Sequence, residues 1–117
     1  MKYILVYGSL RKNSKRGYNF NRFGGQTYIK DIELAGFDMY DLGSYPAIGY
    51  GTHGLKCELH SITDDSYDKI LRMEVAAGYN PVILKGLEHE PTVFVLNQYI
   101  IDKIKQKSPL VASGDWD

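Results

Sequence analysis

Residues 3–7 (Tyr-Ile-Leu-Val-Tyr) form an unbroken run of β-branched and aromatic side chains that ends at Gly8 and Ser9. A strand with one face in water alternates apolar and polar residues, whereas a continuous apolar run is typical of a strand that is buried on both faces. The run therefore predicts a central strand of a sheet near the start of the chain, followed at once by a turn.

Other strands are predicted from apolar patterning at residues 28–42, 55–62 and 92–96. In the first of these segments, apolar residues move from even positions such as Leu34 to odd positions such as Phe37. Because side chains alternate along a strand, a β-bulge near Ala35 and Gly36 is predicted to restore the buried face. The connecting segments are predicted as a long loop with room for one helical turn, a turn, and a flexible loop, at residues 11–25, 43–48 and 49–54.

One segment has the pattern of an amphipathic helix. Thr63 or Asp64 can cap its first turn, and the acidic residues at this end suit the positive pole of the helix dipole. The apolar residues that follow at helical spacing are Tyr67, Ile70 and Leu71. The pattern continues as far as Gly78, which predicts the end of the helix.

The last part of the chain is less regular. Residues 98–107 carry isoleucines on one side and lysines elsewhere, which indicates a short amphipathic helix, although the β-branched residues also fit a strand. Residues 109–117 are predicted as an irregular tail in which Trp116 docks on the domain. No repeat or linker interrupts the sequence, so we expect a single α+β domain, mostly sheet, over residues 1–117.

Composition excludes several classes of protein. The chain has 14 Lys+Arg and 14 Asp+Glu, and zero net charge argues against a protein that tracks nucleic-acid phosphates. Cys57 is the single cysteine, so no intrachain disulfide is possible. The first apolar run is too short for a signal sequence or a membrane span, and we expect a soluble, cytoplasmic protein without a membrane partner. Ten residues are tyrosine, which suits the walls of a wet pocket or an interface.

Glu74 lies on the apolar stripe of the predicted helix. It completes the i, i+3, i+4, i+7 set of Tyr67, Ile70 and Leu71, so its side chain points with theirs. A carboxylate there must be paired, hydrogen-bonded or protonated, because burial disfavours its charge and raises its pKa. Two interpretations follow: a general acid/base, which needs a pKa near neutrality, or a structural glutamate bonded to a tyrosine hydroxyl or to backbone amides.

The segment Tyr7-Gly8-Ser9-Leu10, where the first strand ends, is a second candidate. Successive backbone N–H groups at such a strand end can bind an anion or a carbonyl oxygen, although an ordinary turn has the same sequence pattern. The basic residues that follow are Arg11, Lys12, Lys15 and Arg16. They fit either a phosphate site or a solvated loop.

Three other patterns are not interpreted as sites. Residues 49–54 match G-x-G-x-x-G, but the dinucleotide motif needs a strand before it and a helix after it, and here a turn precedes and a strand follows. His53, His60 and His89 lack the spacing of a metal-binding pair, so no metal site is expected. Cys57 lies within a predicted strand, which is typical of a small buried hydrophobe.

Taken in order, these features resemble the γ-glutamylcyclotransferase-like family, in its AIG2-like branch of small cyclotransferases. The similarity spans nearly the whole chain. The segments that carry it are Val6-Tyr7-Gly8-Ser9-Leu10-Arg11, Tyr45-Pro46-Ala47-Ile48, Cys57-Glu58-Leu59, the helix with Glu74 and Tyr79 after it, and Ser113-Gly114-Asp115-Trp116.

The resemblance implies a small mixed β-barrel with flanking helices and a cavity beside the first strand. The implied reaction is intramolecular aminolysis of a γ-glutamyl amine or γ-glutamyl amino acid, which releases 5-oxoproline. No cofactor or metal is implied, because the substrate's own amine is the nucleophile. The site residues that it implies are Glu74 as the acid/base and, for the substrate, Tyr7, Gly8, Ser9, Leu10, Tyr45 and Tyr79.

Two other functions are consistent with the residues. A non-catalytic module with the same fold and pocket would bind a small ligand or a partner without turnover. A nucleotide or RNA binder would use the basic residues between Arg11 and Arg16, and its binding would depend on salt. Release of 5-oxoproline from a γ-glutamyl compound separates the enzyme from both.

Overall fold

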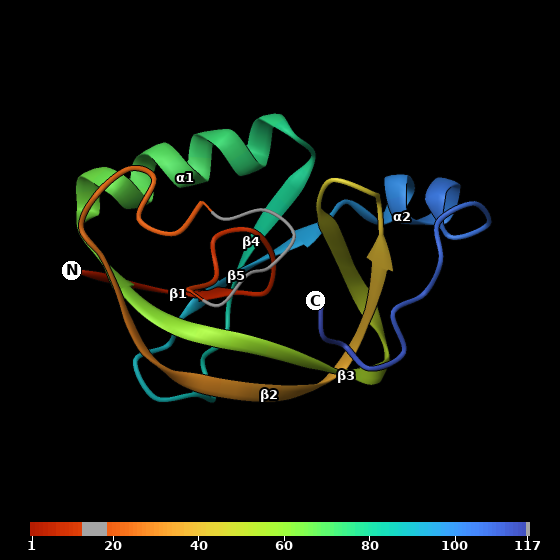
Figure 1. Cartoon of the computed structure of the whole chain (residues 1–117), viewed down its shortest axis with the longest axis horizontal. Helices are drawn as coiled ribbons and strands as arrows, with labels where there is room; N and C mark the ends of the chain where they lie inside the picture. The colour runs from red at the N-terminus through yellow and green to blue at the C-terminus, as the bar shows by residue number, and fades with distance from the viewer. Residues whose placement is uncertain (13–18, 117) are drawn as a thin grey trace.

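The computed structural model describes residues 1–12 and 19–116, and Figure 1 shows how the elements are arranged. In chain order they are β1 (Lys2–Val6), β2 (Gln26–Asp41), β3 (Pro46–Ile62), α1 (Asp64–Ala76), β4 (Tyr79–Ile83), β5 (Thr92–Leu96) and α2 (Gln98–Ile104). One mixed sheet with two helices beside it confirms the predicted α+β class.

β1 is the central strand of the five-stranded sheet, whose order is β2-β3-β1-β5-β4. It pairs antiparallel with β3 and parallel with β5. Ile4 and Val6 belong to one buried cluster and Leu5 to another, and each of these residues is at most 5% exposed. The prediction of a central strand that is buried on both faces is confirmed.

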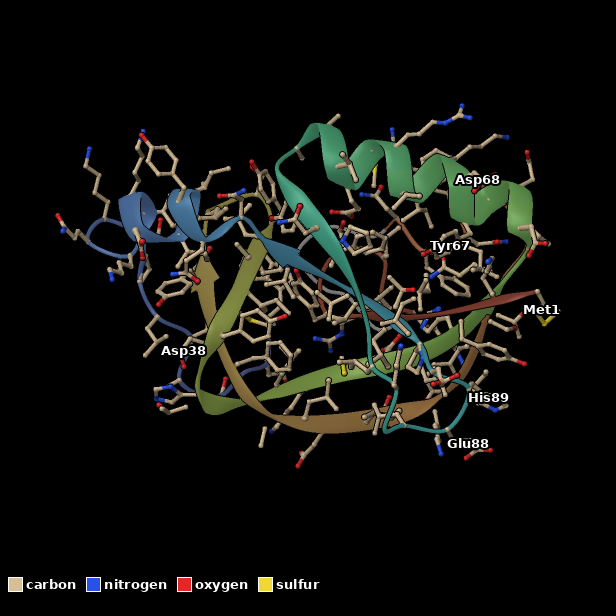
Figure 2. The ribbon with its side chains drawn as sticks, turned by 180° about the vertical axis from the view of Figure 1, so that it is seen from behind. Met1, Asp38, Tyr67, Asp68, Glu88 and His89 are labelled. Carbon is tan, nitrogen blue, oxygen red and sulfur yellow. The ribbon has the colours of Figure 1, made fainter. Side chains whose placement is uncertain are left out.

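The two helices cover the same buried cluster. Ile70 of α1 and Ile101 of α2 both pack into the cluster that contains the even-numbered residues of β1. Figure 2 shows Tyr67 extending from α1 toward the sheet, with Asp68 on the outer side of the helix. The Tyr67 hydroxyl lies 3.1 Å from Oγ1 of Thr92 in β5. The predicted apolar stripe of α1 therefore faces the sheet.

The C-terminal tail packs into the other cluster. Trp116 is 2% exposed and joins the cluster that contains Leu5 and Tyr7, so the predicted docking of this residue is confirmed. The backbone N–H of Lys56 donates to the carbonyl of Gly114 at 2.8 Å, which fixes the tail along β3.

β2 and β3 form a long antiparallel pair that bends around the core (Figure 1). The register shifts between Ala35 and Phe37, which is the predicted bulge, and Gly36 occupies it with a φ of 91°. A second shift, between Tyr28 and Lys30, has no counterpart in the apolar pattern. Within the described residues β2 and β4 are the two edges of an open sheet, so the implied barrel is not confirmed.

The Gly-rich segment after β2 is more regular than predicted. The turn expected at residues 43–48 ends before Pro46, and residues 49–54, expected to be a flexible loop, belong to β3. Pairing with β2 orders this segment. Asp38 of β2 accepts hydrogen bonds from the backbone N–H of His53 at 3.2 Å and from its Nδ1 at 2.7 Å. Cross-strand contacts therefore outweigh the low strand propensity of glycine.

Both predicted helices are present. Thr63 caps α1 by accepting a hydrogen bond from the backbone N–H of Ser66, and the chain leaves this helix at Gly78, where φ is 96°. Residues 98–104 are helical rather than extended, which resolves the alternative, and Asn97 is the cap of α2. Neither helix, in the described part of the chain, is long and apolar enough to cross a membrane.

β4 is missing from the sequence prediction. Its residues Asn80 and Pro81 are unfavourable in strands. The strand nevertheless forms because it is an edge strand that pairs with β5 alone, and an edge tolerates a proline that cannot donate a hydrogen bond. The sharp turn at Gly78 sends the chain from α1 directly into β4, which places Tyr79 beside the end of the helix.

Candidate active site

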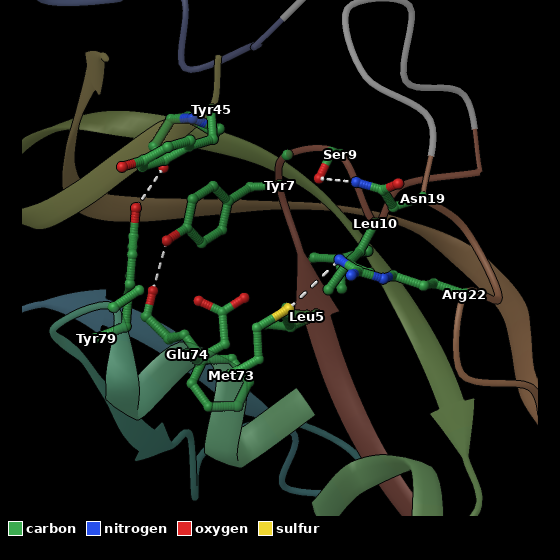
Figure 3. Close-up of a pocket in the computed structure, with 15 residues that line it drawn as sticks. Leu5, Tyr7, Ser9, Leu10, Asn19, Arg22, Tyr45, Met73, Glu74 and Tyr79 are labelled. Atoms are coloured by element: carbon green, nitrogen blue, oxygen red, sulfur yellow. Dashed lines mark hydrogen bonds between the residues drawn. The ribbon is translucent and has the colours of Figure 1, made fainter. Parts of the chain in front are cut away.

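A cavity of about 320 Å³ opens at the end of β1. Its walls come from the loop after β1, the start of β3, the C-terminal end of α1, and strands β4 and β5 (Figure 3). Each residue that the sequence predicts for the site lines this cavity: Tyr7, Gly8, Ser9, Leu10, Tyr45, Glu74 and Tyr79. The sheet brings them together because β3 is next to β1, and the α1–β4 connection lies over the same strand end.

Glu74 points into the cavity from the last turns of α1 (Figure 3). Its side chain is half-buried, and within the described residues its carboxylate forms no hydrogen bond. Burial raises the pKa of Glu74 from 4.5 to about 7. The structural interpretation, a glutamate bonded to a tyrosine or to amides, is not what the geometry shows. A carboxyl group with this pKa can accept or donate a proton near neutral pH.

Tyr7 and Tyr79 form the wall next to Glu74, with both hydroxyls bonded to the main chain. The Tyr7 hydroxyl donates to the carbonyl of Phe94 at 2.6 Å, and the Tyr79 hydroxyl donates to the carbonyl of Pro46 at 2.9 Å. Burial raises the pKa of both phenols, and the nearby Glu74 raises them further. The two tyrosines therefore stay neutral and give the cavity a fixed wall.

The loop after β1 lines the cavity with Gly8, Ser9 and Leu10. Within the described residues, the N–H groups of Gly8, Ser9 and Leu10 donate to no protein acceptor. A Cβ at Gly8 would lie 2.9 Å from the ring of Pro46, so glycine permits the close approach of this loop to β3. Asn19 holds the loop from its other side, because its backbone N–H donates to the carbonyl of Ser9 at 2.7 Å.

Several lining residues are absent from the sequence prediction, among them Asn19, Arg22 and Met73. Asn19 and Arg22 reach the cavity because the loop folds back on itself, and no periodic pattern signals such a return. Arg22 is the one cationic side chain among the described lining residues. Its guanidinium approaches the Met73 sulfur at 3.8 Å, a weak acceptor, and no carboxylate of the described residues pairs with it.

The basic run is not a continuous surface patch in the described structure. The Arg11 side chain is 11% exposed and forms ion pairs with Asp115 at 3.0 Å and with Glu58 at 3.8 Å. The Lys12 ammonium lies 4.9 Å from the centre of the Tyr28 ring. Lys15 and Arg16 lie outside the described residues. These contacts favour a structural role for the described half of the run.

The three histidines and the cysteine lie away from the cavity. His53, His60 and His89 are in separate places, and the described part of the chain holds no cluster of potential metal ligands. Cys57 is 3% exposed, and burial raises the pKa of its thiol to about 12. A thiol with this pKa is a poor nucleophile at neutral pH.

Comparison with known proteins gives a family and a fold. The family described as gamma-glutamyl cyclotransferase, AIG2-like, matches residues 4–117. A crystal structure of an uncharacterized protein from Pyrococcus horikoshii has 20% identity and a TM-score of 0.72, over 100% of this chain and 91% of that one. The solution NMR structure of protein ytfP from Escherichia coli has 24% identity and a TM-score of 0.74, over 97% and 95% of the two chains. No curated protein matches significantly.

Proposed function

The chain belongs to the AIG2-like gamma-glutamyl cyclotransferase family, and we propose that it converts a γ-glutamyl compound into 5-oxoproline and an amine or amino acid. One observation carries the proposal. The Glu74 carboxyl, whose pKa is raised, lies in the same cavity as Gly8, Ser9 and Leu10. The N–H groups of these three residues donate to no protein acceptor within the described residues. A proton carrier and hydrogen-bond donors for a carbonyl oxygen are the groups that this reaction needs.

In the proposed reaction the substrate supplies its own nucleophile. The α-amino nitrogen attacks the γ-carbonyl carbon, a new C–N bond closes the five-membered lactam, and the γ-amide C–N bond breaks. Glu74 takes the proton that the attacking amine loses and gives it to the leaving nitrogen, so the carboxylate is regenerated after each turnover. No covalent enzyme intermediate and no external reactant are required.

The cavity contributes to the rate in two further ways. The amine and the γ-carbonyl are already joined in one molecule, and the cavity holds the substrate in the folded conformer in which the amine faces the carbonyl carbon. The N–H groups of Gly8, Ser9 and Leu10 hold the γ-glutamyl part of the substrate. They also offset the charge that develops on its carbonyl oxygen.

The direct test is 5-oxoproline release from a panel of γ-glutamyl amino acids and γ-glutamylamines. We expect turnover of at least one compound, unchanged by a metal chelator, measured by mass spectrometry against heat-inactivated protein as the control for spontaneous cyclisation. If no compound is converted but some raise the Tm of the protein, the cavity belongs to a non-catalytic binding module.

The position of Arg22 predicts which leaving group the protein prefers. Arg22 lines the cavity, and no carboxylate of the described residues pairs with its guanidinium. A hydrogen bond from a guanidinium to a substrate carboxylate contributes about 1.5–3 kcal/mol. We therefore expect γ-glutamyl-alanine to be preferred over γ-glutamyl-ethylamine, which lacks only the carboxylate, by about tenfold in kcat/KM. Arg22→Met should remove this preference by raising KM for the amino-acid substrate alone. An equal loss with both substrates would assign Arg22 to the glutamyl part instead.

A further inference from the structure

We propose that Gln26, Glu58 and His60 are positioning residues that hold the loop after β1 in the shape needed to bind substrate. The inference rests on the proposed function, because it concerns the same loop N–H groups. All three side chains are buried, with His60 at 0%, Glu58 at 2% and Gln26 at 5% exposure, and none of them lines the cavity. They therefore act on the site only through the loop.

The three side chains form one hydrogen-bonded chain across β2 and β3. Nε2 of His60 lies 2.9 Å from Oε1 of Glu58, and Nδ1 of His60 lies 2.8 Å from Nε2 of Gln26. These residues come from neighbouring strands in fixed register, with Gln26 opposite Ile62 and Tyr28 opposite His60. The network is thus built on two hydrogen-bonded strands of the sheet.

The direction of each hydrogen bond follows from the contacts at the two ends. Oε1 of Gln26 accepts the backbone N–H of Asn21 at 3.1 Å, so its Nε2 is the donor end of the amide. Nδ1 of His60 must then accept, and its Nε2 carries the proton that is donated to Glu58. Burial also lowers the pKa of His60, which favours this neutral ring. The network has a single consistent arrangement of donors and acceptors.

Both ends of the network hold main-chain atoms of the loop. Nε2 of Gln26 also donates to the carbonyl of Leu10 at 3.1 Å, and Oε1 of Glu58 accepts the backbone N–H of Lys12 at 2.7 Å. These peptide groups directly follow Gly8, Ser9 and Leu10, which line the cavity and whose N–H groups have no acceptor among the described residues. Fixing them sets the direction of those N–H groups before any substrate arrives, and such preorganisation is what makes donors effective.

Gln26→Met is the first test, because it keeps the size of the side chain and removes its hydrogen bonds to Leu10, His60 and Asn21. We expect the NMR order parameters of the Ser9 and Leu10 amides to fall from the rigid value of about 0.85 to below about 0.6, with the sheet unchanged. kcat/KM should fall about tenfold, because the loosened N–H groups both bind the γ-glutamyl part and offset the charge that develops on its carbonyl oxygen. Thr27→Val, one residue along β2 and exposed, is the matched control and should change neither quantity.

A second variant covers the case in which Gln26→Met does not fold. Glu58→Gln preserves the shape of the side chain and replaces the charged oxygen that accepts from both His60 and Lys12 with a neutral amide oxygen. This weakens both hydrogen bonds and removes the ion pair with Arg11 at 3.8 Å, so it should loosen the same amides. In the wild-type protein, ¹⁵N spectra should show His60 with its proton on Nε2. A proton on Nδ1, or loop order parameters that both variants leave unchanged, would overturn the inference.

Turnover and loop motion also separate this inference from the proposed function. A looser loop with an unchanged kcat/KM would leave the network with a purely structural role and overturn its positioning role. If the wild-type protein converts no γ-glutamyl compound, the proposed function fails and the assignment of a substrate role falls with it. The order parameters then still decide whether the network holds the loop.

Discussion

Glu74→Gln should reduce 5-oxoproline release by about 100-fold to 10,000-fold and, at the same time, make the protein more stable above neutral pH. The loss of turnover follows because the amide cannot take the proton from the attacking amine, and general acid/base groups contribute factors of this size. In the wild-type protein, kcat/KM should rise with pH through about 7, as the carboxylate form of Glu74 becomes populated. The variant should lack this step.

The effect on stability has the opposite sign. Burial raises the pKa of folded Glu74 from 4.5 to about 7, so between these values the folded protein binds more protons than the unfolded chain. The free energy of unfolding therefore decreases as the pH rises through this window. The shift corresponds to at most about 3 kcal/mol, and to about 1–2 kcal/mol after allowance for the partial exposure of the side chain. The Glu74→Gln variant has no ionisable group at this position, so its free energy of unfolding does not decrease in this way.

Thermal unfolding at two pH values measures this difference. At pH 8 the Tm of Glu74→Gln should exceed that of the wild type by several degrees, and at pH 4, where the carboxyl is protonated in both states, the two should agree. Glu33→Gln, an exposed position on β2, is the control and should alter neither turnover nor Tm. Full turnover in Glu74→Gln would exclude the acid/base role, and a Tm difference independent of pH would exclude a buried ionisable group.

The parts of the site that the sequence predicts are those with a local pattern. A continuous apolar run identifies β1, and its end at Gly8 marks the loop that reaches the cavity. The helical period places Glu74 on the stripe that faces the sheet, and the structure finds it at the cavity. Both inferences need only the spacing of neighbouring residues, which the chain keeps in any surroundings.

The parts that the sequence does not predict depend on contacts between distant segments. β4 forms with Pro81 in it because β5 offers a partner at the edge of the sheet, and residues 49–54 are extended because β2 pairs with them. Arg22 reaches the cavity through the return of a loop. None of these outcomes can be predicted from the spacing of apolar residues, which repeats every two residues in a strand and every 3.6 in a helix.

The sequence did contain a pattern from which the network of Glu58 and His60 could have been predicted. They lie two residues apart in a predicted strand, so they share one face of it, while Cys57 and Leu59 share the other. Both faces of this part of β3 are buried, with all four residues at most 3% exposed. A Glu and a His on one buried face must hydrogen-bond each other or a third group, so a strand that is buried on both faces and carries this pair indicates a polar network.

Gly114→Ala should lower the free energy of unfolding by about 3–5 kcal/mol, the range for removing a large aromatic side chain from a core. Gly114 has a φ of 69°, and a Cβ there would overlap the backbone carbonyl of Gly54 in β3. Backbone atoms of a paired strand cannot move aside, so the tail must leave its place. Trp116 would then lose its position in the cluster with Leu5 and Tyr7, and Asp115 would lose Arg11.

Gly36→Ala is the matched control for this prediction. Gly36 also has a positive φ, 91°, but a Cβ there has no atom within 4 Å, so only the backbone strain of about 1–2 kcal/mol is expected. Urea unfolding of the two variants separates strain from the clash. Trp116 is the single tryptophan, so its emission reports docking of the tail, and it should shift to the red in Gly114→Ala before any urea is added. If both variants were equally stable and emission were unshifted, the contact between Gly114 and β3 would not be what holds the tail.

A detached tail would also take Asp115 away from Arg11, which lies in the loop after β1, so turnover should fall in Gly114→Ala and persist in Gly36→Ala.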